Sequence, residues 1–324
     1  MKRIQNKIKS GFVIVTVVVS ASGVWAQDSI TFIPSWKVGD SHNYIFSRLR
    51  QDYTNDTLYS SSTFDYTVSL TATRSQPEES ELTLIYKGKS KDYKVLKKTP
   101  DKFVLANALE YLTIKLYGFS SLKVVYTIDA RGTFLGIKNK NELRNYISSV
   151  LTAAKHDQQV TPDFAGVLEQ LKPTLLSDDY VEYSFLPEIQ FYHLLYSKSW
   201  KPGNQQNEIE VPNPVTGEGL PGILTAEVKK VAVKKPAPRK ELPIYEIVMQ
   251  QKLDQARLMK AMQETAHQTG IENNGTPPID FNAVYRYTVK DHLIKKASYI
   301  KTVVSAESKS VEEFLIRPVI PGAK

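Results

Sequence analysis

The sequence predicts an α+β fold that is mainly antiparallel β, built from two related curved-sheet halves with packing helices. Residues 64–73 alternate between apolar and polar side chains, which is typical of a sheet with one wet face. Strand patterns dominate both ends of the chain, and helical patterns gather in its middle. Short motifs also recur in the two halves of the chain.

Residues 1–26 have the pattern of a secretory signal peptide. Four basic residues precede the apolar run Gly11–Val19, which is shorter than the roughly 20 residues that span a bilayer. Val24-Trp25-Ala26 fits a cleavage site. We therefore expect cleavage after Ala26 and no transmembrane span in the mature chain. An uncleaved N-terminal anchor is the alternative.

The net charge of the whole chain is +8, from 42 Lys+Arg and 34 Asp+Glu. Residues 1–26 hold four of these bases and no acid, so the remaining residues carry a net charge of +4. We expect no nucleic-acid partner, because a phosphate footprint needs a concentrated basic face. The local surplus at Lys229–Lys240 fits an edge strand and linker, or a contact with an acidic envelope polymer or lipid head group.

The chain has no cysteine and 5 histidines. This composition excludes thiol nucleophiles, disulfides and Cys-ligated zinc. Exported eukaryotic domains of this size usually hold disulfides, so we expect a bacterial protein that is periplasmic, extracellular or on the cell surface. No catalytic residue, metal site or cofactor is expected, because neither H-E-x-x-H nor G-x-S-x-G occurs.

The first half of the chain shows a series of strand patterns. We expect strands over residues 41–53, 64–73, 81–90, 123–129 and 133–138. The last two flank Ala130-Arg131-Gly132, a hairpin turn with glycine. The segment that follows Pro100 fits either a helix or a strand.

Helices are expected in the middle of the chain. Asn141 precedes a helical stripe, and Thr161-Pro162-Asp163 offers an N-cap residue, a first-turn proline and an acid. The second helix should end at Pro173. A third helix is expected over Gln250–Gln268, where methionines recur at helical spacing. Its stripe fits a core-facing surface, or an adaptable surface for a lipid or partner, because methionine repacks easily.

Two motifs suggest an internal repeat. Residues 35–40 (S-W-K-V-G-D) return as residues 199–204 (S-W-K-P-G-N), and residues 125–129 (V-Y-T-I-D) are echoed by residues 286–290 (R-Y-T-V-K). Chance recurrence is the alternative. The repeat predicts the following division: signal peptide 1–26, first β-rich half 27–155, helical and aromatic connector 156–196, second β-rich half 197–324.

The motif W-K-x-G-D at Trp36–Asp40 and the motif Y-x-I-D-x-x-G at Tyr126–Gly132 resemble those of secreted bacterial β-rich proteins of uncharacterised function. Such chains are similar to the half-barrel sheets of envelope lipoprotein carriers and related lipid-binding proteins. The resemblance implies a curved sheet that holds an apolar ligand. It supplies no defined site residues.

We therefore expect a non-catalytic exported envelope protein that binds an apolar or amphipathic ligand, such as a lipid, in a curved β-sheet. Two alternatives stay open: a protein–protein interaction or scaffold module of the envelope, and a hydrolase whose site is assembled from distant acids. The candidate ligand-binding residues lie on the alternating strand and on the methionine-bearing segment: Phe64, Tyr66, Val68, Leu70, Met249, Leu253, Met259 and Met262.

Overall fold

The computed structural model describes residues 29–87, 122–154, 156, 162–196, 198–212, 219–231, 243–260, 279–290, 292–305 and 308–319. The chain divides into two compact units. Unit 1 comprises Met1–Thr31, Arg50–Leu58 and Ser199–Phe314. Unit 2 comprises Phe32–Leu49, Tyr59–Lys198 and Leu315–Lys324.

Unit 2 is built on strands that follow one another along the chain. They are β2 (Ser41–Thr54), β3 (Thr57–Ser75), β4 (Glu79–Lys87), β5 (Lys123–Asp129) and β6 (Phe134–Ile137); residues 50–54 of β2 and 57–58 of β3 are counted with unit 1. Their order in the sheet is β6-β5-β4-β3-β2. The pairs β3–β4, β4–β5 and β5–β6 are antiparallel. All five strands were predicted; residues 88–90 and the segment that follows Pro100 lie outside the described residues.

Three helices belong to unit 2: α3 (Lys140–Ala154), α4 (Pro162–Leu175) and α5 (Asp178–His193). Helix α4 continues through Pro173, where we expected it to end. A proline this close to the end removes a single helical hydrogen bond, and α4 ends two residues later. Ser177 is the N-cap of helix α5, and its hydroxyl accepts a hydrogen bond of 3.2 Å from the backbone N–H of Tyr180.

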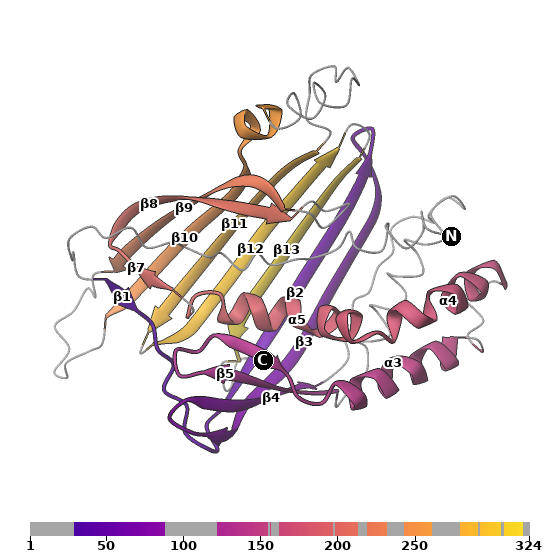
Figure 1. The fold of residues 1–324 in the computed structure, drawn as a ribbon, viewed down its shortest axis with the longest axis horizontal. Coiled ribbons are helices and arrows are strands. Elements are labelled where there is room, and N and C mark those ends of the chain that lie inside the picture. The colour runs from indigo at the N-terminus through magenta and orange to yellow at the C-terminus, as the bar shows by residue number, and fades with distance from the viewer. Residues whose placement is uncertain are drawn as a thin grey trace. The chain divides into compact units, whose positions relative to one another are not determined.

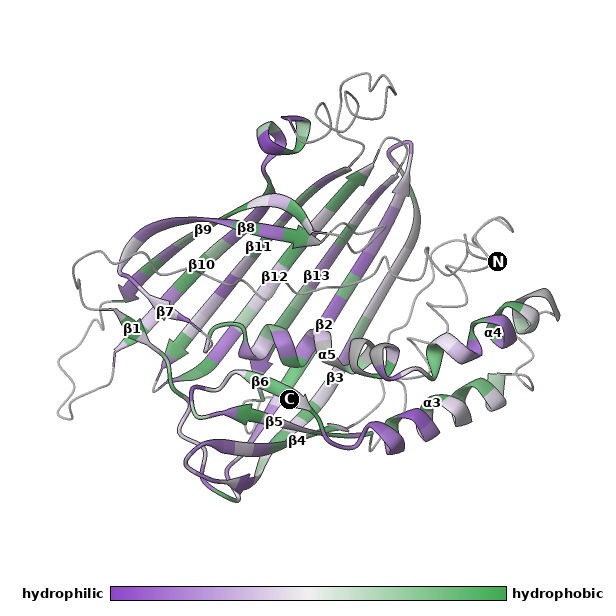
Figure 2. Ribbon diagram, viewed as in Figure 1, coloured by the Kyte–Doolittle hydropathy of each residue, from purple (hydrophilic) through white to green (hydrophobic). Residues whose placement is uncertain are grey.

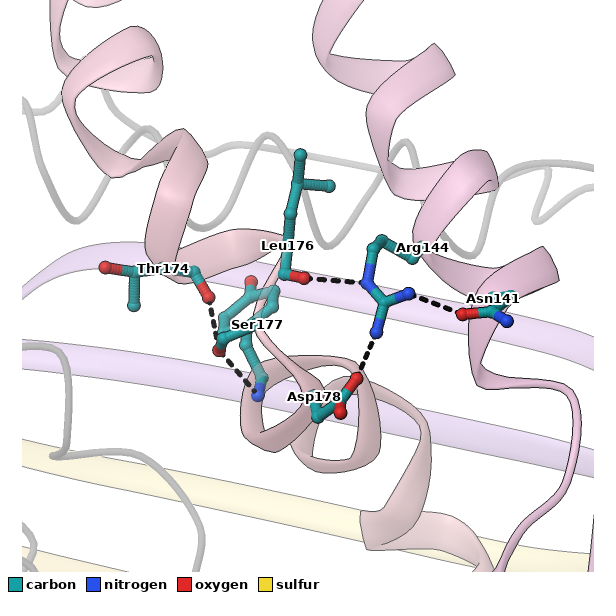
Figure 3. Close-up of polar contacts among 7 residues, drawn as sticks. Asn141, Arg144, Thr174, Leu176, Ser177 and Asp178 are labelled. Atoms are coloured by element: carbon teal, nitrogen blue, oxygen red, sulfur yellow. Dashed lines mark hydrogen bonds and ion pairs between the residues drawn. The ribbon is translucent and has the colours of Figure 1, made fainter.

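Arg144 of α3 holds the turn between α4 and α5 (Figure 3). Its Nε donates a hydrogen bond of 2.9 Å to the carbonyl oxygen of Leu176, and its guanidinium also pairs with the Asp178 carboxylate. The same guanidinium donates to Asn141 Oδ1 at 2.6 Å. One side chain of α3 therefore contacts both the residue that follows α4 and the first residue of α5.

Unit 1 is built on β8 (Gly203–Pro212), β9 (Gly219–Val231), β10 (Ile244–Leu253), β11 (Ile279–Lys290), β12 (Leu293–Ser305) and β13 (Ser308–Pro318); residues 315–318 of β13 are counted with unit 2. They lie in the order β13-β12-β11-β10-β9-β8, and the pairs from β8 to β12 are antiparallel. Figure 1 shows β10–β13 running side by side and β8–β9 curving at the edge. Strands β1 (Ile30–Thr31) and β7 (Ser199–Trp200) form a separate antiparallel pair.

The predicted helix over Gln250–Gln268 is wrong at its start. Met249 and Leu253 belong to β10, which pairs with β9 and β11 along its length. A helical segment begins only at Gln255, where Asp254 Oδ1 accepts a hydrogen bond of 3.1 Å from the backbone N–H of Arg257. Residues 261–268 lie outside the described residues. Pairing with a strand on each side therefore makes residues 244–253 a strand, although the spacing of the apolar residues from Met249 onward also fits a helix.

The predicted fold class is confirmed, since the described residues form a mainly antiparallel β protein with helices. Polar and apolar bands alternate along the strands in Figure 2. The repeated turns share a backbone conformation: Gly39 and Gly203 have φ angles of 91° and 88°. Each follows a buried tryptophan, Trp36 or Trp200. The duplication itself stays a prediction.

Candidate functional site

Unit 1 presents one mainly apolar sheet face. Every second side chain is buried over residues 224–228 of β9, 247–253 of β10 and 281–289 of β11, and Ala297 and Tyr299 of β12 are buried. The cause is that successive side chains of a strand point to opposite faces. We call this surface the buried face of unit 1. It includes Leu224, Ile247, Met249, Leu253, Ala283 and Ala297.

Polar side chains interrupt this face, and we give the name polar row to Gln251, Tyr285, Tyr299 and Glu312. The Tyr285 hydroxyl donates a hydrogen bond of 2.9 Å to Oε1 of Gln251. The Tyr299 hydroxyl donates a hydrogen bond of 2.8 Å to Oε1 of Glu312. The two tyrosines are direct cross-strand partners with ring centroids 5.9 Å apart. The row thus crosses β10, β11, β12 and β13.

Burial of the polar row in a sheet face has a free-energy cost. Gln251 and Glu312 are each 5% exposed, and burial of a polar group is costly unless hydrogen bonds compensate. Burial, with the neighbouring Glu312 carboxyl as a smaller cause, raises the pKa of Tyr285 well above its ordinary value. Tyr285 therefore remains a hydrogen-bond donor at neutral pH.

Ala283 lies directly opposite Gln251 on one side and Lys301 on the other. Direct cross-strand partners share a face, so all three belong to the buried face of unit 1. The Lys301 ammonium lies 6.0 Å from the centroid of the Phe281 ring. A small side chain is therefore flanked by an amide and a cation.

Unit 2 has a different polar arrangement, in which three hydrogen bonds attach α5 to the sheet. Tyr192 bonds to Tyr44 of β2 at 3.0 Å between their hydroxyls. The Tyr66 hydroxyl of β3 donates to Glu188 at 2.9 Å. The third bond joins His193 to Tyr126 of β5. We call these six side chains the α5 anchor; all of them are buried.

The protonation of His193 follows from its partners. Its Nδ1 lies 2.9 Å from the carbonyl oxygen of Gly132, which can only accept, so Nδ1 carries the proton. Nε2 therefore accepts from the Tyr126 hydroxyl at 2.9 Å. Burial lowers the pKa of His193 to about 4, against smaller opposing effects of the Gly132 hydrogen bond and Asp129. His193 is therefore neutral at neutral pH, which suits a structural hydrogen-bond chain.

The structure separates the predicted ligand-binding residues into two groups. Phe64, Tyr66, Val68 and Leu70 lie buried on one face of β3 in unit 2. In unit 1, Met249 lies directly opposite Tyr285, and Met249 and Leu253 alternate with Gln251 on the same face.

The remaining two candidates follow β10. Met259 is half-buried on the short helical segment. Met262 lies outside the described residues.

The polar row was absent from the predicted site residues. Its partners are 34 and 13 residues apart in sequence, so only the sheet register brings them together. The sequence holds one indication of the polar row. Gln251 and Glu312 stand at positions where the period-two pattern predicts apolar side chains.

Among the described residues, no group of three His, Cys, Asp or Glu side chains is arranged to hold a metal ion. The same part of the chain contains no helix with the length and apolar character needed to span a membrane.

No family model matches the sequence, and no curated protein matches it. Among solved structures, the chain is similar to DynF from the dynemicin biosynthesis pathway of Micromonospora chersina. The identity is 8%, the match covers 95% of this chain and 98% of that chain, and the TM-score is 0.18. A TM-score this low carries no argument about fold or function.

Proposed function

We propose that the protein is a non-catalytic binding protein that holds an amphipathic ligand against the buried face of unit 1. The observation that carries this proposal is the polar row within an apolar face. An apolar side chain at Gln251 or Glu312 would pack without the cost of burying a polar group. Hydrogen-bonding groups set among apolar side chains are typical of small-molecule sites, where they fix the orientation of the ligand.

The alternative of a partner surface at the aromatic connector has less support. Between residues 180 and 200, five described aromatic side chains are buried, namely Phe185, Phe191, Tyr192, Tyr196 and Trp200, whereas Tyr180 is half-buried. The five buried side chains form core rather than accessible surface, so they are unavailable to an external partner in this conformation.

The proposal is tested with the neutral apolar fluorophore N-phenyl-1-naphthylamine and the purified chain 27–324. We expect saturable binding by the wild type and at least a tenfold weaker affinity in Met249→Trp, whose added volume fills the buried face of unit 1. The matched control is Val248→Trp, because the Val248 side chain lies on the opposite face of β10. Far-UV circular dichroism and thermal melting verify that both variants fold. Absence of saturable binding by the folded wild type, or equal affinities in the two variants, would overturn the proposal.

The second part of the proposal is export to the bacterial envelope. Its support is the basic, then apolar, then small-residue order of residues 1–26. Expression of the full chain with a C-terminal tag, followed by cell fractionation and N-terminal sequencing, tests it. We expect an envelope or medium fraction whose chain begins at Gln27. A cytoplasmic chain that begins at Met1 would contradict it.

A further inference from the structure

Strand β8 is the edge strand of unit 1 (Figure 1). In the part of the chain that the structure describes, it pairs with β9 on one side and with no strand on the other. The outer backbone groups of an edge strand offer a row of donors and acceptors to another chain. Alternate side chains of β8 are exposed: Asn204, Gln206, Glu208 and Glu210. A second strand could therefore be added at this edge.

The usual features that block an edge are absent from β8. Proteins protect edge strands with lysines, prolines and β-bulges. Strand β8 has no lysine, its one proline is its last residue, and its register with β9 is unbroken. Its charged residues are Glu208 and Glu210. The Glu208 carboxylate lies 2.8 Å from the guanidinium of Arg257, yet its side chain is 77% exposed. The two glutamates therefore decide which strand fits.

A second copy of β8 fits this charge pattern. Two copies can run antiparallel about a two-fold axis, with Asn207 of one copy opposite Asn207 of the other. Gln206 then lies opposite Glu208, and Asn204 lies opposite Glu210. An amide donates hydrogen bonds and a carboxylate accepts them, so each glutamate meets a donor and no two glutamates meet.

Other registers fit less well. A two-fold axis at Glu208 places like charges directly opposite each other, which is destabilising. An axis at Gln206 leaves Glu210 opposite Pro202, beyond the start of the strand. An axis between two residues places exposed side chains opposite those of the other face. The register centred on Asn207 is also the one that pairs the whole segment 203–211 with itself.

We propose that β8 pairs antiparallel with β8 of a second copy of this chain, about a two-fold axis at Asn207, and that the protein forms a homodimer through this edge. The same surface serves both copies, as in other two-fold dimers. A single pair of strands is a small contact, which is typical of a reversible association. This interface is independent of the ligand proposed above.

The first test measures the dimer by sedimentation velocity of the purified chain 27–324 from micromolar to submillimolar concentration. We expect a reversible dimer. Gln206→Glu should weaken it at least tenfold, because it places two carboxylates opposite each other on both sides of the axis. Gln206→Lys should strengthen it at least threefold, because the lysine then lies opposite Glu208. The matched controls are Ser298→Glu and Ser298→Lys on β12, four strands from β8, and they should leave the affinity unchanged.

The second test measures the register with single cysteines, since the natural chain has none. In the proposed dimer the two Asn207→Cys residues lie about 5 Å apart between Cα atoms, which is within reach of a disulfide. The two Gln205→Cys residues would be separated by about 13 Å along the strands. Mild oxidation should therefore cross-link Asn207→Cys and leave Gln205→Cys monomeric on a non-reducing gel.

Thermal melting and circular dichroism of each variant verify folding. A wild type that stays monomeric at every concentration refutes the dimer. If Gln206→Glu and Gln206→Lys change the affinity in the same direction, or if Gln205→Cys cross-links as fast as Asn207→Cys, the two copies do not meet in this register and the proposed interface is refuted.

Discussion

The Tyr126 hydroxyl donates a hydrogen bond of 2.9 Å to Nε2 of His193, and this bond joins β5 to α5 in the interior of unit 2. The arrangement requires a neutral imidazole, because Nε2 must accept while Nδ1 donates to Gly132. Protonation of Nε2 would remove the acceptor and place a charge in a buried site. The α5 anchor is therefore sensitive to acid.

The first prediction concerns this sensitivity. Burial lowers the pKa of His193 from 6.5 to about 4. Between these two pH values, His193 is mostly protonated in the unfolded chain and mostly neutral in the folded chain. Stability is fully present above pH 6.5 and is lost as the pH falls from 6.5 to 4, by up to about 3 kcal/mol. Urea unfolding at pH 7.5, 6, 5 and 4.5 measures it. His193→Gln should flatten the profile over this window, whereas His156→Gln, at an exposed position, should not.

The second prediction concerns the hydroxyl pair Tyr44 and Tyr192, 3.0 Å apart. Burial raises the pKa of Tyr44 to about 12, so both hydroxyls remain protonated at neutral pH. Tyr44→Phe and Tyr192→Phe should each cost about 1–2 kcal/mol, because each leaves a buried hydroxyl without its partner. The double variant should cost less than the sum, since no orphaned hydroxyl remains. If the losses in the free energy of unfolding are additive in urea unfolding, the two hydroxyls are not energetically coupled.

The third prediction concerns Gly132, whose φ is 88°. A Cβ there would lie 2.6 Å from Pro34 Cγ, whereas a Cβ at Gly39 or Gly136 would meet nothing within 4 Å. Gly132→Ala should therefore cost more than about 2 kcal/mol, from both backbone strain and the clash. Gly39 has a φ of 91°, so Gly39→Ala should cost about 1 kcal/mol from the backbone alone.

Gly136→Ala is the control for this series, since Gly136 has neither a positive φ nor a close neighbour. Thermal melting should rank the three variants in the order Gly132, Gly39, Gly136. If Gly39→Ala costs as much as Gly132→Ala, the contact with Pro34 contributes nothing.

The sheet of unit 2 was predictable because its signal is local. Strand β3 buries Phe64, Tyr66 and Val68, and this period-two alternation is visible in a few consecutive residues. The sequence predicts a helix where β10 lies, because Met249 and Leu253, four residues apart, fit either a helix or a strand. Pairing with β9 and β11 determines that this segment is a strand. These partners are distant in the sequence, so the residues near 250 do not indicate the pairing.

The candidate site was predictable only in part, for the same reason. The methionine-bearing stripe predicts Met249 and Leu253 as ligand-binding residues, and in the structure they flank Gln251 on β10. The polar row depends on the register of four strands, so neither Tyr285 nor Glu312 could be connected to Gln251 before that register was known. Hydrogen bonds between distant residues leave no periodic signal in the sequence.

The fourth prediction concerns Arg144, which bonds both a backbone carbonyl and a carboxylate at the α4–α5 turn. Arg144→Lys should cost about 1 kcal/mol, because an ammonium cannot reproduce the planar fork that reaches Leu176 and Asp178 together. Asp178→Asn should cost less, since a largely exposed ion pair contributes little. Urea unfolding measures both, with Arg131→Lys at an exposed turn position as the control. An Asp178→Asn loss that equals the Arg144→Lys loss would instead identify the ion pair, rather than the bond to the Leu176 carbonyl, as the contact that holds the turn.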